Sequence, residues 1–173
     1  MPRLDETFKA SDYEKKPKDP NKESDYLKFI NPDTKIRILT SPIRGYEYFK
    51  EDDKPVRSRT PIRNPVWMKN DWKVKEFWAM VVYNHDLQKI KIWIMTQNTI
   101  KTQLIAFSND EDYWSPLEYD IKINKSWIWL DTKYLVKPLN KSEISQDIKD
   151  EADRVNLEAL YDNQDPFNTD KSF

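Results

Sequence analysis

Cationic and aromatic side chains gather in two parts of this chain. Between residues 35 and 75, eleven basic residues stand against five acidic ones, and this window holds five of the seven arginines of the chain. A second run, residues 89–95, alternates lysine with apolar side chains. Cationic groups bind phosphates and aromatic faces stack on unpaired bases, so the two types together predict binding of a single nucleic-acid strand. The predicted phosphate contacts are Arg37, Arg44, Arg57, Arg59, Arg63, Lys89 and Lys91, and the predicted stacking residues are Tyr46, Tyr48, Trp72 and Trp93.

Each of these groups also has a purely structural interpretation. A solvated charged face accounts for the arginine cluster, and Trp93 then packs beneath a loop. Tyr46 and Tyr48 are then ordinary strand residues covered by residues 51–73, and Trp72 anchors that long segment. Solvated faces usually mix the two signs of charge and prefer lysine, which favours the binding interpretation for the arginines.

Catalytic chemistry finds little support in the sequence. Glu118, Asp120 and Lys122 imitate half of a metal-dependent nuclease site, but the same spacing is expected on the outward face of an ordinary strand. His85 is the only histidine, and it falls in a predicted turn, where a solvated side chain is the simpler interpretation. The chain has no cysteine and one glycine, Gly45, which excludes thiol nucleophiles, cysteine-held zinc, Gly-rich phosphate loops and a nucleophile elbow. We therefore expect a protein that is not an enzyme and holds no metal or cofactor.

The composition predicts one folded domain with a segment on each side of it. The chain has 173 residues, of which 34% are charged and 13% aromatic. Residues 1–25 are rich in Lys, Asp, Glu and Pro, which predicts a mobile arm. Residues 142–173 carry nine acidic and three basic side chains, so 141–173 is expected to form an acidic, partly helical tail beside a folded domain of residues 26–140. No long apolar run or signal segment is present, which predicts a cytoplasmic protein with no membrane partner.

Alternating side chains predict most of the strands. Residues 34–41 and 43–50 are expected to form one long strand that bends at Pro42 and Gly45, with the glycine kept for curvature or for the approach of a nucleotide. Residues 51–73 show no periodicity and are expected to form a long loop with short extended pieces. Strands over 75–83 and 88–96 then form a hairpin whose turn is 84–87, with Ile90, Ile92 and Ile94 inward and Lys89, Lys91 and Trp93 outward.

Helical spacing appears twice. Ile100, Leu104 and Phe107 predict a short helix with Thr96 or Asn98 as its N-cap. Two strands follow, one containing Tyr119, Ile121 and Ile123 and one over residues 127–137. A weak helix is expected around Ile144, Ile148 and Val155, and the residues after 160 show no periodicity.

This order of elements predicts a mainly β protein with an OB-fold, a five-stranded barrel that has one short helix between its third and fourth strands. An unrelated meander with one helix has the same order, so the order alone leaves both folds open.

The segments "KIRILTSPIRGYEYF…KPVRS", "FWAMVVYN…KIKIWIMTQNTIKTQL" and "YDIKI" resemble the single-stranded DNA-binding proteins of tailed bacteriophages over residues 26–138. The resemblance implies an OB-fold that coats single-stranded DNA during phage replication, recombination and repair, in the cytoplasm of the host cell and without catalysis. It also implies an acidic C-terminal tail that recruits replication proteins, here ending in Phe173, although Lys171 interrupts the acidic run. The alternatives are a protein-interaction module of a phage or mobile element and a metal-dependent nuclease.

Overall fold

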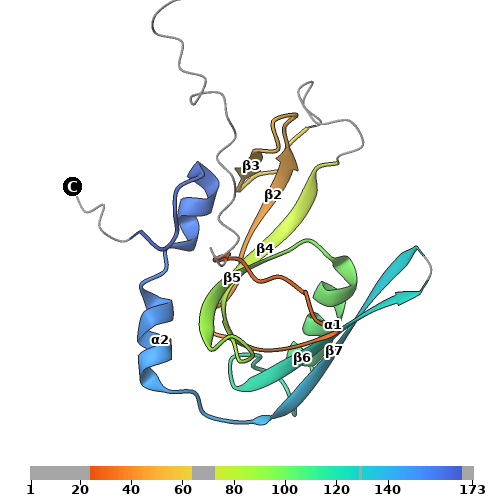
Figure 1. Ribbon diagram of the computed structural model, residues 1–173, viewed down its shortest axis with the longest axis vertical. Coiled ribbons are helices and arrows are strands. Elements are labelled where there is room, and N and C mark those ends of the chain that lie inside the picture. Colours follow the sequence, from red (N-terminus) through yellow and green to blue (C-terminus); the bar gives the residue numbers. More distant parts are fainter. Residues whose placement is uncertain (1–23, 64–72, 129, 169–173) are drawn as a thin grey trace, which may run out of the picture.

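In the part of the chain that the structure describes, seven antiparallel strands form one sheet, confirming the predicted mainly β class. A computed structural model describes residues 24–63, 73–128 and 130–168. Its elements are β1 (Asp33–Ile38), β2 (Ile43–Phe49), β3 (Pro55–Ser58), β4 (Lys75–Asn84), β5 (Lys89–Met95), α1 (Asn98–Ser108), β6 (Tyr119–Ile128), β7 (Asp131–Lys141), α2 (Gln146–Asp153) and the 3-10 helix η2 (Leu157–Asp162) (Figure 1). Within these residues, no helix has the length and apolar character needed to cross a bilayer.

Strand β4 is the centre of the sheet, because β1 and β2 pair in turn along it and β5 pairs with it as well. Ile38 is opposite Val82 and Ile43 is opposite Ala79, so the ladder slips over residues 39–42. From Ile43 onward the register is constant through Gly45. The irregularity predicted at Pro42 and Gly45 therefore lies only at the first of them.

The hairpins differ in how well the sequence predicts them. The β4–β5 hairpin is confirmed, and the side-chain oxygen of Asn84 holds its turn by accepting hydrogen bonds from the backbone N–H groups of Asp86 and Leu87 at 2.9 and 3.2 Å. The segment 51–73, expected to be a long loop with short extended pieces, contains β3, which forms a second hairpin with β2. Four residues are too few for alternation to reveal a strand.

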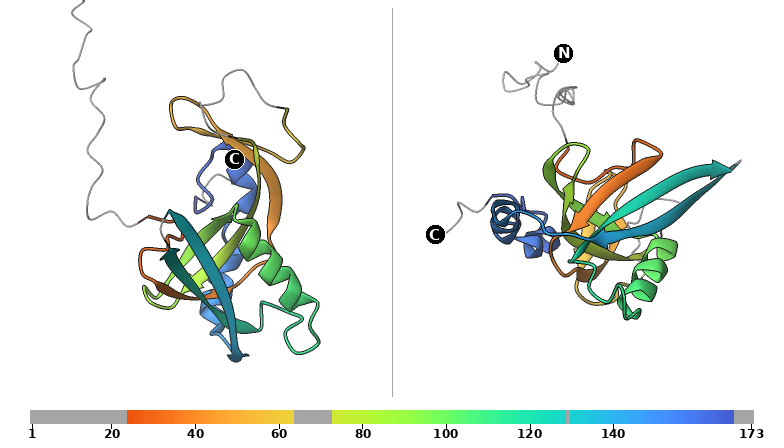
Figure 2. Two further views of the ribbon diagram at one scale, coloured as in Figure 1. Left: turned by 90° about the vertical axis from the view of Figure 1, so that its right-hand side faces the viewer. Right: turned by 90° about the horizontal axis from the view of Figure 1, so that it is seen from below.

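The hairpin of β6 and β7 projects from the body of the protein (Figure 2). The strand predicted to begin at residue 127 begins at Asp131, because β6 continues as far as Ile128. Helix α1 is confirmed between β5 and β6, but its N-cap is Gln97 rather than Thr96 or Asn98. The helix is attached to β7 by Gln103, whose amide donates to the carbonyl oxygen of Tyr134 at 3.0 Å.

A segment near the N-terminus lies along β5. The backbone N–H of Leu27 donates to the carbonyl oxygen of Ile92 at 2.8 Å, and the N–H of Ile92 donates to the carbonyl oxygen of Asp25 at 2.9 Å. The Phe29 ring then packs on Trp93 of β5 and Tyr134 of β7. In the described part of the chain no ladder joins β5 to β7, so the sheet is open and strand pairing does not close the predicted five-stranded barrel.

Apolar side chains form one cluster on each side of β4 and β5. The inner cluster contains Met80, Trp93 and Met95 and is covered by α1. The outer cluster joins Phe77, Val81 and Ile92 to the C-terminal segment through Ala152, Leu157 and Leu160. Residues 146–162, expected to belong to an acidic tail, therefore pack as α2 and η2 over the outer face of the sheet (Figure 1).

Candidate nucleic-acid interface

Trp93 and Lys91 point in the direction opposite to the prediction. The alternation along β5 is confirmed, but Trp93 faces the inner cluster with 1% of its surface exposed. Ile90 and Ile92 face outward beneath α2 and η2. Lys91 is buried as well, and its ammonium donates to the carbonyl oxygen of Ser24. The prediction that Lys91 and Trp93 contact DNA is therefore wrong, because both sides of β5 are covered.

Arg37 is an internal cation. It is 2% exposed, and its Nε donates to Oδ1 of Asp120 at 2.8 Å while its Nη2 donates to the carbonyl oxygen of Ser142 at 2.8 Å. His85, expected to be solvated in its turn, places Nε2 2.9 Å from the same carboxylate oxygen. This network joins β1, β6 and the residues after β7, so Arg37 is not available to a phosphate. Among the described residues, no three or more His, Cys, Asp or Glu side chains form a group able to hold a metal ion.

Two further arginines belong to the outer face of the sheet. Nε of Arg57 donates to a carboxylate oxygen of Glu47 at 3.0 Å, and both side chains are nearly buried. Arg59 is exposed, pairs with Glu158 and lies over the Tyr161 ring, with its guanidinium carbon 4.1 Å from the ring centroid. The hydrogen bond that Arg59 donates to the Glu158 carboxylate raises the pKa of Arg59. Both arginines therefore contribute to the packing of the C-terminal segment.

Arg44, Tyr46 and Tyr48 remain together on one face of β2. In the ladders, Arg44 is opposite Trp78 of β4, and Tyr46 is opposite both Glu76 of β4 and Ser58 of β3. Side chains directly opposite each other, and side chains two residues apart, lie on the same face of a sheet. We call this surface the tyrosine face and define it by Arg44, Tyr46, Tyr48, Glu76 and Trp78.

The reverse side of these strands is covered. The rings of Phe77 and Tyr161 lie 6.1 Å apart, and the Tyr161 hydroxyl donates to the carbonyl oxygen of Arg44. Asn163 donates from its side chain to the carbonyl oxygen of Pro55 at 3.1 Å. The C-terminal segment thus fixes the position of β2 and β3, and the tyrosine face points away from it.

The tyrosine face carries an exposed ion pair, whose arginine can exchange its carboxylate partner for a phosphate. The Arg44 side chain is 69% exposed and donates to Glu76 at 3.0 Å, and this hydrogen bond lowers the pKa of Glu76. An exposed ion pair of this kind contributes little stability, so its guanidinium can turn to a phosphate at small cost. Lys101 of α1 lies buried beside this pair. Its Nζ donates to the carbonyl oxygen of Glu76 at 2.7 Å, and burial lowers the pKa of Lys101.

Trp78 and Lys101 are absent from the predicted site. Trp78 stands in a strand that is apolar on both sides, and Lys101 falls among the polar positions of a helix, so neither differs from its neighbours in the sequence. Lys101 Nζ lies 5.9 Å from the centroid of the Trp78 ring. Only the register and the position of α1 bring them beside Arg44.

A second basic surface, absent from the predicted site, lies on β1, β6 and β7. Lys122 of β6 is opposite Lys35 of β1 and Lys137 of β7, and this lysine row crosses three strands. At the end of the same hairpin Trp127 is 58% exposed, with Lys125 Nζ 4.8 Å from its ring centroid. The alternation of lysine with apolar neighbours is visible in the sequence of each strand. The alignment of the three lysines in a row depends on strand register, which the sequence does not show.

The remaining predicted residues are not gathered onto the tyrosine face. Lys89 is exposed at the start of β5, opposite Asn84 and so at the far end of β4 from Trp78. Arg63 is exposed. Trp72 and Phe173 lie outside the described residues.

Comparison of the chain with models of protein families, with curated proteins and with solved structures found no match.

Proposed function

We propose that this protein binds single-stranded DNA without strong sequence preference, that it does so through the tyrosine face, and that it catalyses no reaction. The observation that carries the proposal is the placement of Tyr46 and Tyr48 on one face of β2, in line with Arg44 and beside Trp78. Planar side chains in a row beside an exposed cation suit a strand whose bases are unpaired. The resemblance to phage proteins implies that this activity serves the replication, recombination and repair of phage DNA in the host cytoplasm.

The order of the elements supports an OB-type fold as the finer description. Strands β1 and β2 together take the place of the bent first strand, β4 and β5 follow, and α1 lies before β6 and β7. Residues 25–29 lie where the third and fifth strands of a closed barrel would meet.

The packing of the C-terminal segment decides which surface we propose. OB-folds commonly bind oligonucleotides on the outer face of their second and third strands. Here the corresponding face of β4 and β5 is filled by Ala152, Leu157 and Leu160. The proposed site is therefore the opposite side of the β2–β4 extension, where Arg44 contacts phosphates and the tyrosines stack on bases.

The test is a titration of labelled oligo-dT, followed by anisotropy at several salt concentrations. The Tyr46→Ala/Tyr48→Ala variant is expected to bind at least ten-fold more weakly, because stacking on an aromatic side chain is worth about 1–3 kcal/mol per base. The Tyr46→Phe/Tyr48→Phe variant keeps both rings and is expected to retain most of the affinity. Arg44→Ala is expected to weaken binding. The slope of log K against log salt concentration should also become shallower by about 0.7, because one phosphate contact is lost.

The Lys122→Ala/Lys137→Ala variant serves as the matched control, since it removes two cations from the lysine row and no ring. If this variant alone loses binding, the DNA lies on β6 and β7 and the tyrosine face is the wrong surface. If the wild-type protein binds no oligo-dT at low salt, the function itself is wrong. Repeating the titration with double-stranded DNA and with Mg²⁺ tests the nuclease alternative, which requires cleavage.

A protein-interaction module is the second candidate, favoured by the projecting β6–β7 hairpin. Trp127 and Leu130 are both exposed there, and an exposed apolar tip suits contact with a partner protein. Replication proteins that bind the chain end at Phe173 are the partners implied by the resemblance. This candidate predicts that Trp127→Ala abolishes partner binding and leaves DNA binding unchanged.

A further inference from the structure

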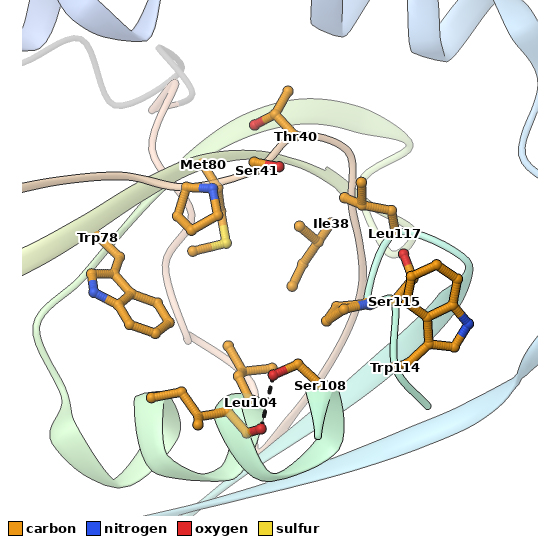
Figure 3. A pocket seen from close by; sticks show the side chains of 13 residues that line it. Ile38, Thr40, Ser41, Trp78, Met80, Leu104, Ser108, Trp114, Ser115 and Leu117 are labelled. Carbon is orange, nitrogen blue, oxygen red and sulfur yellow. Dashed lines mark hydrogen bonds between the residues drawn. The ribbon is translucent and has the colours of Figure 1, made fainter. Parts of the chain in front are cut away.

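An apolar pocket opens between α1, the β1–β2 junction and the loop that precedes β6 (Figure 3). Its volume is about 330 Å³, within the range of about 300–1,000 Å³ that small-molecule ligands occupy. Ile38, Met80 and Leu104 line its inner part. The rings of Trp78 and Trp114 stand on opposite sides of it (Figure 3).

The lining of the pocket suits a neutral planar group. None of the described residues that line it carries a charge, so a phosphate finds no partner inside. Ser41, Ser108 and Ser115 place hydroxyl groups around the pocket, and these hydroxyls can form hydrogen bonds with the polar edge of a ring. A nucleobase has this combination of an apolar face and a polar edge.

The pocket is continuous with the tyrosine face through Trp78, which belongs to both. The lining residue Pro42 lies two positions before Arg44, and Arg44 is directly opposite Trp78 in the ladder. A strand whose phosphate meets Arg44 therefore runs past the opening of the pocket.

The outer wall of the pocket is available from solvent. Trp114 is 62% exposed and Ile105 is 47% exposed, both beside the opening. A Trp ring held in this position can stack on an incoming base without rearrangement of the inner cluster.

We infer that this pocket holds one base of the bound single strand, flanked by Trp78 and Trp114. The inference rests on the proposed function and adds to it the site of one nucleotide. Because a base enters the pocket, the protein distinguishes DNA with bases from the same phosphate chain without them.

The test compares oligo-dT with an abasic oligonucleotide of equal length that keeps the phosphates. Trp114→Ala is expected to weaken oligo-dT binding about ten-fold (about 1.4 kcal/mol) and to leave abasic binding unchanged. Trp114→Phe is expected to keep near wild-type affinity, because a ring remains. Leu87→Ala removes an exposed apolar side chain outside the pocket, in the β4–β5 turn, and is expected to change neither affinity.

A second variant blocks the pocket and leaves Trp114 in place. Ser108→Phe adds a ring from the exposed end of α1, and Ser108→Ala controls for the hydrogen bond that Ser108 donates to the carbonyl oxygen of Ile105 at 2.8 Å. Ser108→Phe is expected to bind oligo-dT about ten-fold more weakly, and Ser108→Ala is expected to bind normally. Unchanged oligo-dT affinity in both Trp114→Ala and Ser108→Phe overturns the inference while the proposed function stands. That result assigns the pocket to another occupant, such as an apolar side chain of a partner protein. Absence of oligo-dT binding by the wild-type protein overturns both.

Discussion

Gly45 lies directly opposite Phe77 in the ladder between β2 and β4, and the two residues are in such close contact that no side chain fits between them. A Cβ atom on Gly45 would stand 2.8 Å from Cε1 of the Phe77 ring and 2.7 Å from the carbonyl oxygen of Ser58. The ring has some freedom to move, but the carbonyl belongs to the backbone of β3. The single glycine of the chain is thus required for close packing of three strands, and neither reason expected from the sequence, strand curvature or the approach of a nucleotide, is needed.

Gly45→Ala is expected to lower the free energy of unfolding by about 1–3 kcal/mol, the usual cost of overpacking a core. Phe77→Leu in the same chain should not restore the loss, because the Ser58 carbonyl remains in place. Urea denaturation followed by tryptophan fluorescence measures both effects. An alanine variant as stable as the wild type would contradict the packing argument.

Arg37→Ala is expected to destabilise the protein by about 3–5 kcal/mol, because it leaves the buried Asp120 carboxylate without its main partner. Arg44→Ala is the matched control, and its exposed ion pair predicts a loss below about 1 kcal/mol. Thermal unfolding compares the two variants. If Arg37→Ala folds normally and loses DNA binding, the sequence-based assignment of Arg37 to a phosphate is correct after all.

The stability of the protein is expected to fall as the pH rises from about 10 to about 12. Burial raises the pKa of Tyr119 to about 12, while the same tyrosine in the unfolded chain ionises near 10. Below pH 10 the phenol is neutral in both states and its contribution is fully present. Above pH 10 the unfolded state loses the proton first, which removes up to about 2–3 kcal/mol by pH 12.

Tyr119→Phe tests this pH dependence. The variant loses a hydrogen bond to the carbonyl oxygen of Tyr113, worth about 1 kcal/mol at neutral pH, and should show a weaker decline in alkaline solution. Tyr134→Phe is a control on β7. Equal declines for wild type and Tyr119→Phe between pH 10 and 12 would assign the alkaline loss to other groups.

Deletion of residues 142–173 is expected to unfold or aggregate the protein. The sequence alone predicts the opposite outcome, a folded protein with higher affinity for DNA, because the deleted part is an acidic competitor. In the structure, Leu160 is 1% exposed within the outer cluster, so the deletion uncovers β4 and β5. Leu160→Ala alone should cost about 2–5 kcal/mol, whereas exposed Asp162→Asn should cost almost nothing.

Circular dichroism and size-exclusion chromatography separate these outcomes. A folded, monomeric deletion variant with raised affinity for oligo-dT at low salt would restore the competitor interpretation and show that the apolar contacts of α2 and η2 are dispensable.

Local patterns predict the strands and the helix α1 well, because alternation and helical spacing are properties of neighbouring residues. They do not predict which side of a strand faces the core. Both sides of β5 are buried. The alternation of isoleucine with Trp93 therefore reveals the strand but not which of its sides faces the inner cluster. The position of Trp93 depends on what covers each side, namely α1 on one and α2 with η2 on the other.

Long-range partners explain the errors in the predicted site. Arg37 and Asp120 are 83 residues apart, and nothing near either residue indicates the other. Arg59 and Glu158 are 99 residues apart. A count of arginines therefore overestimates the charge available to DNA. Alternation along β2 is enough to put Tyr46 and Tyr48 on one face, since that relation is local, but Trp78 joins them only through strand register.

The docking of α2 and η2 on the sheet has a consequence for the order of folding. During synthesis, β4 and β5 leave the ribosome well before Leu157 and Leu160, so their outer apolar face has no cover during that interval. A nascent chain stalled before residue 150 therefore exposes the apolar outer face of the sheet. Chaperones bind surfaces of this kind, and such surfaces promote aggregation. Folding of this domain is therefore completed only after translation of the C-terminal segment.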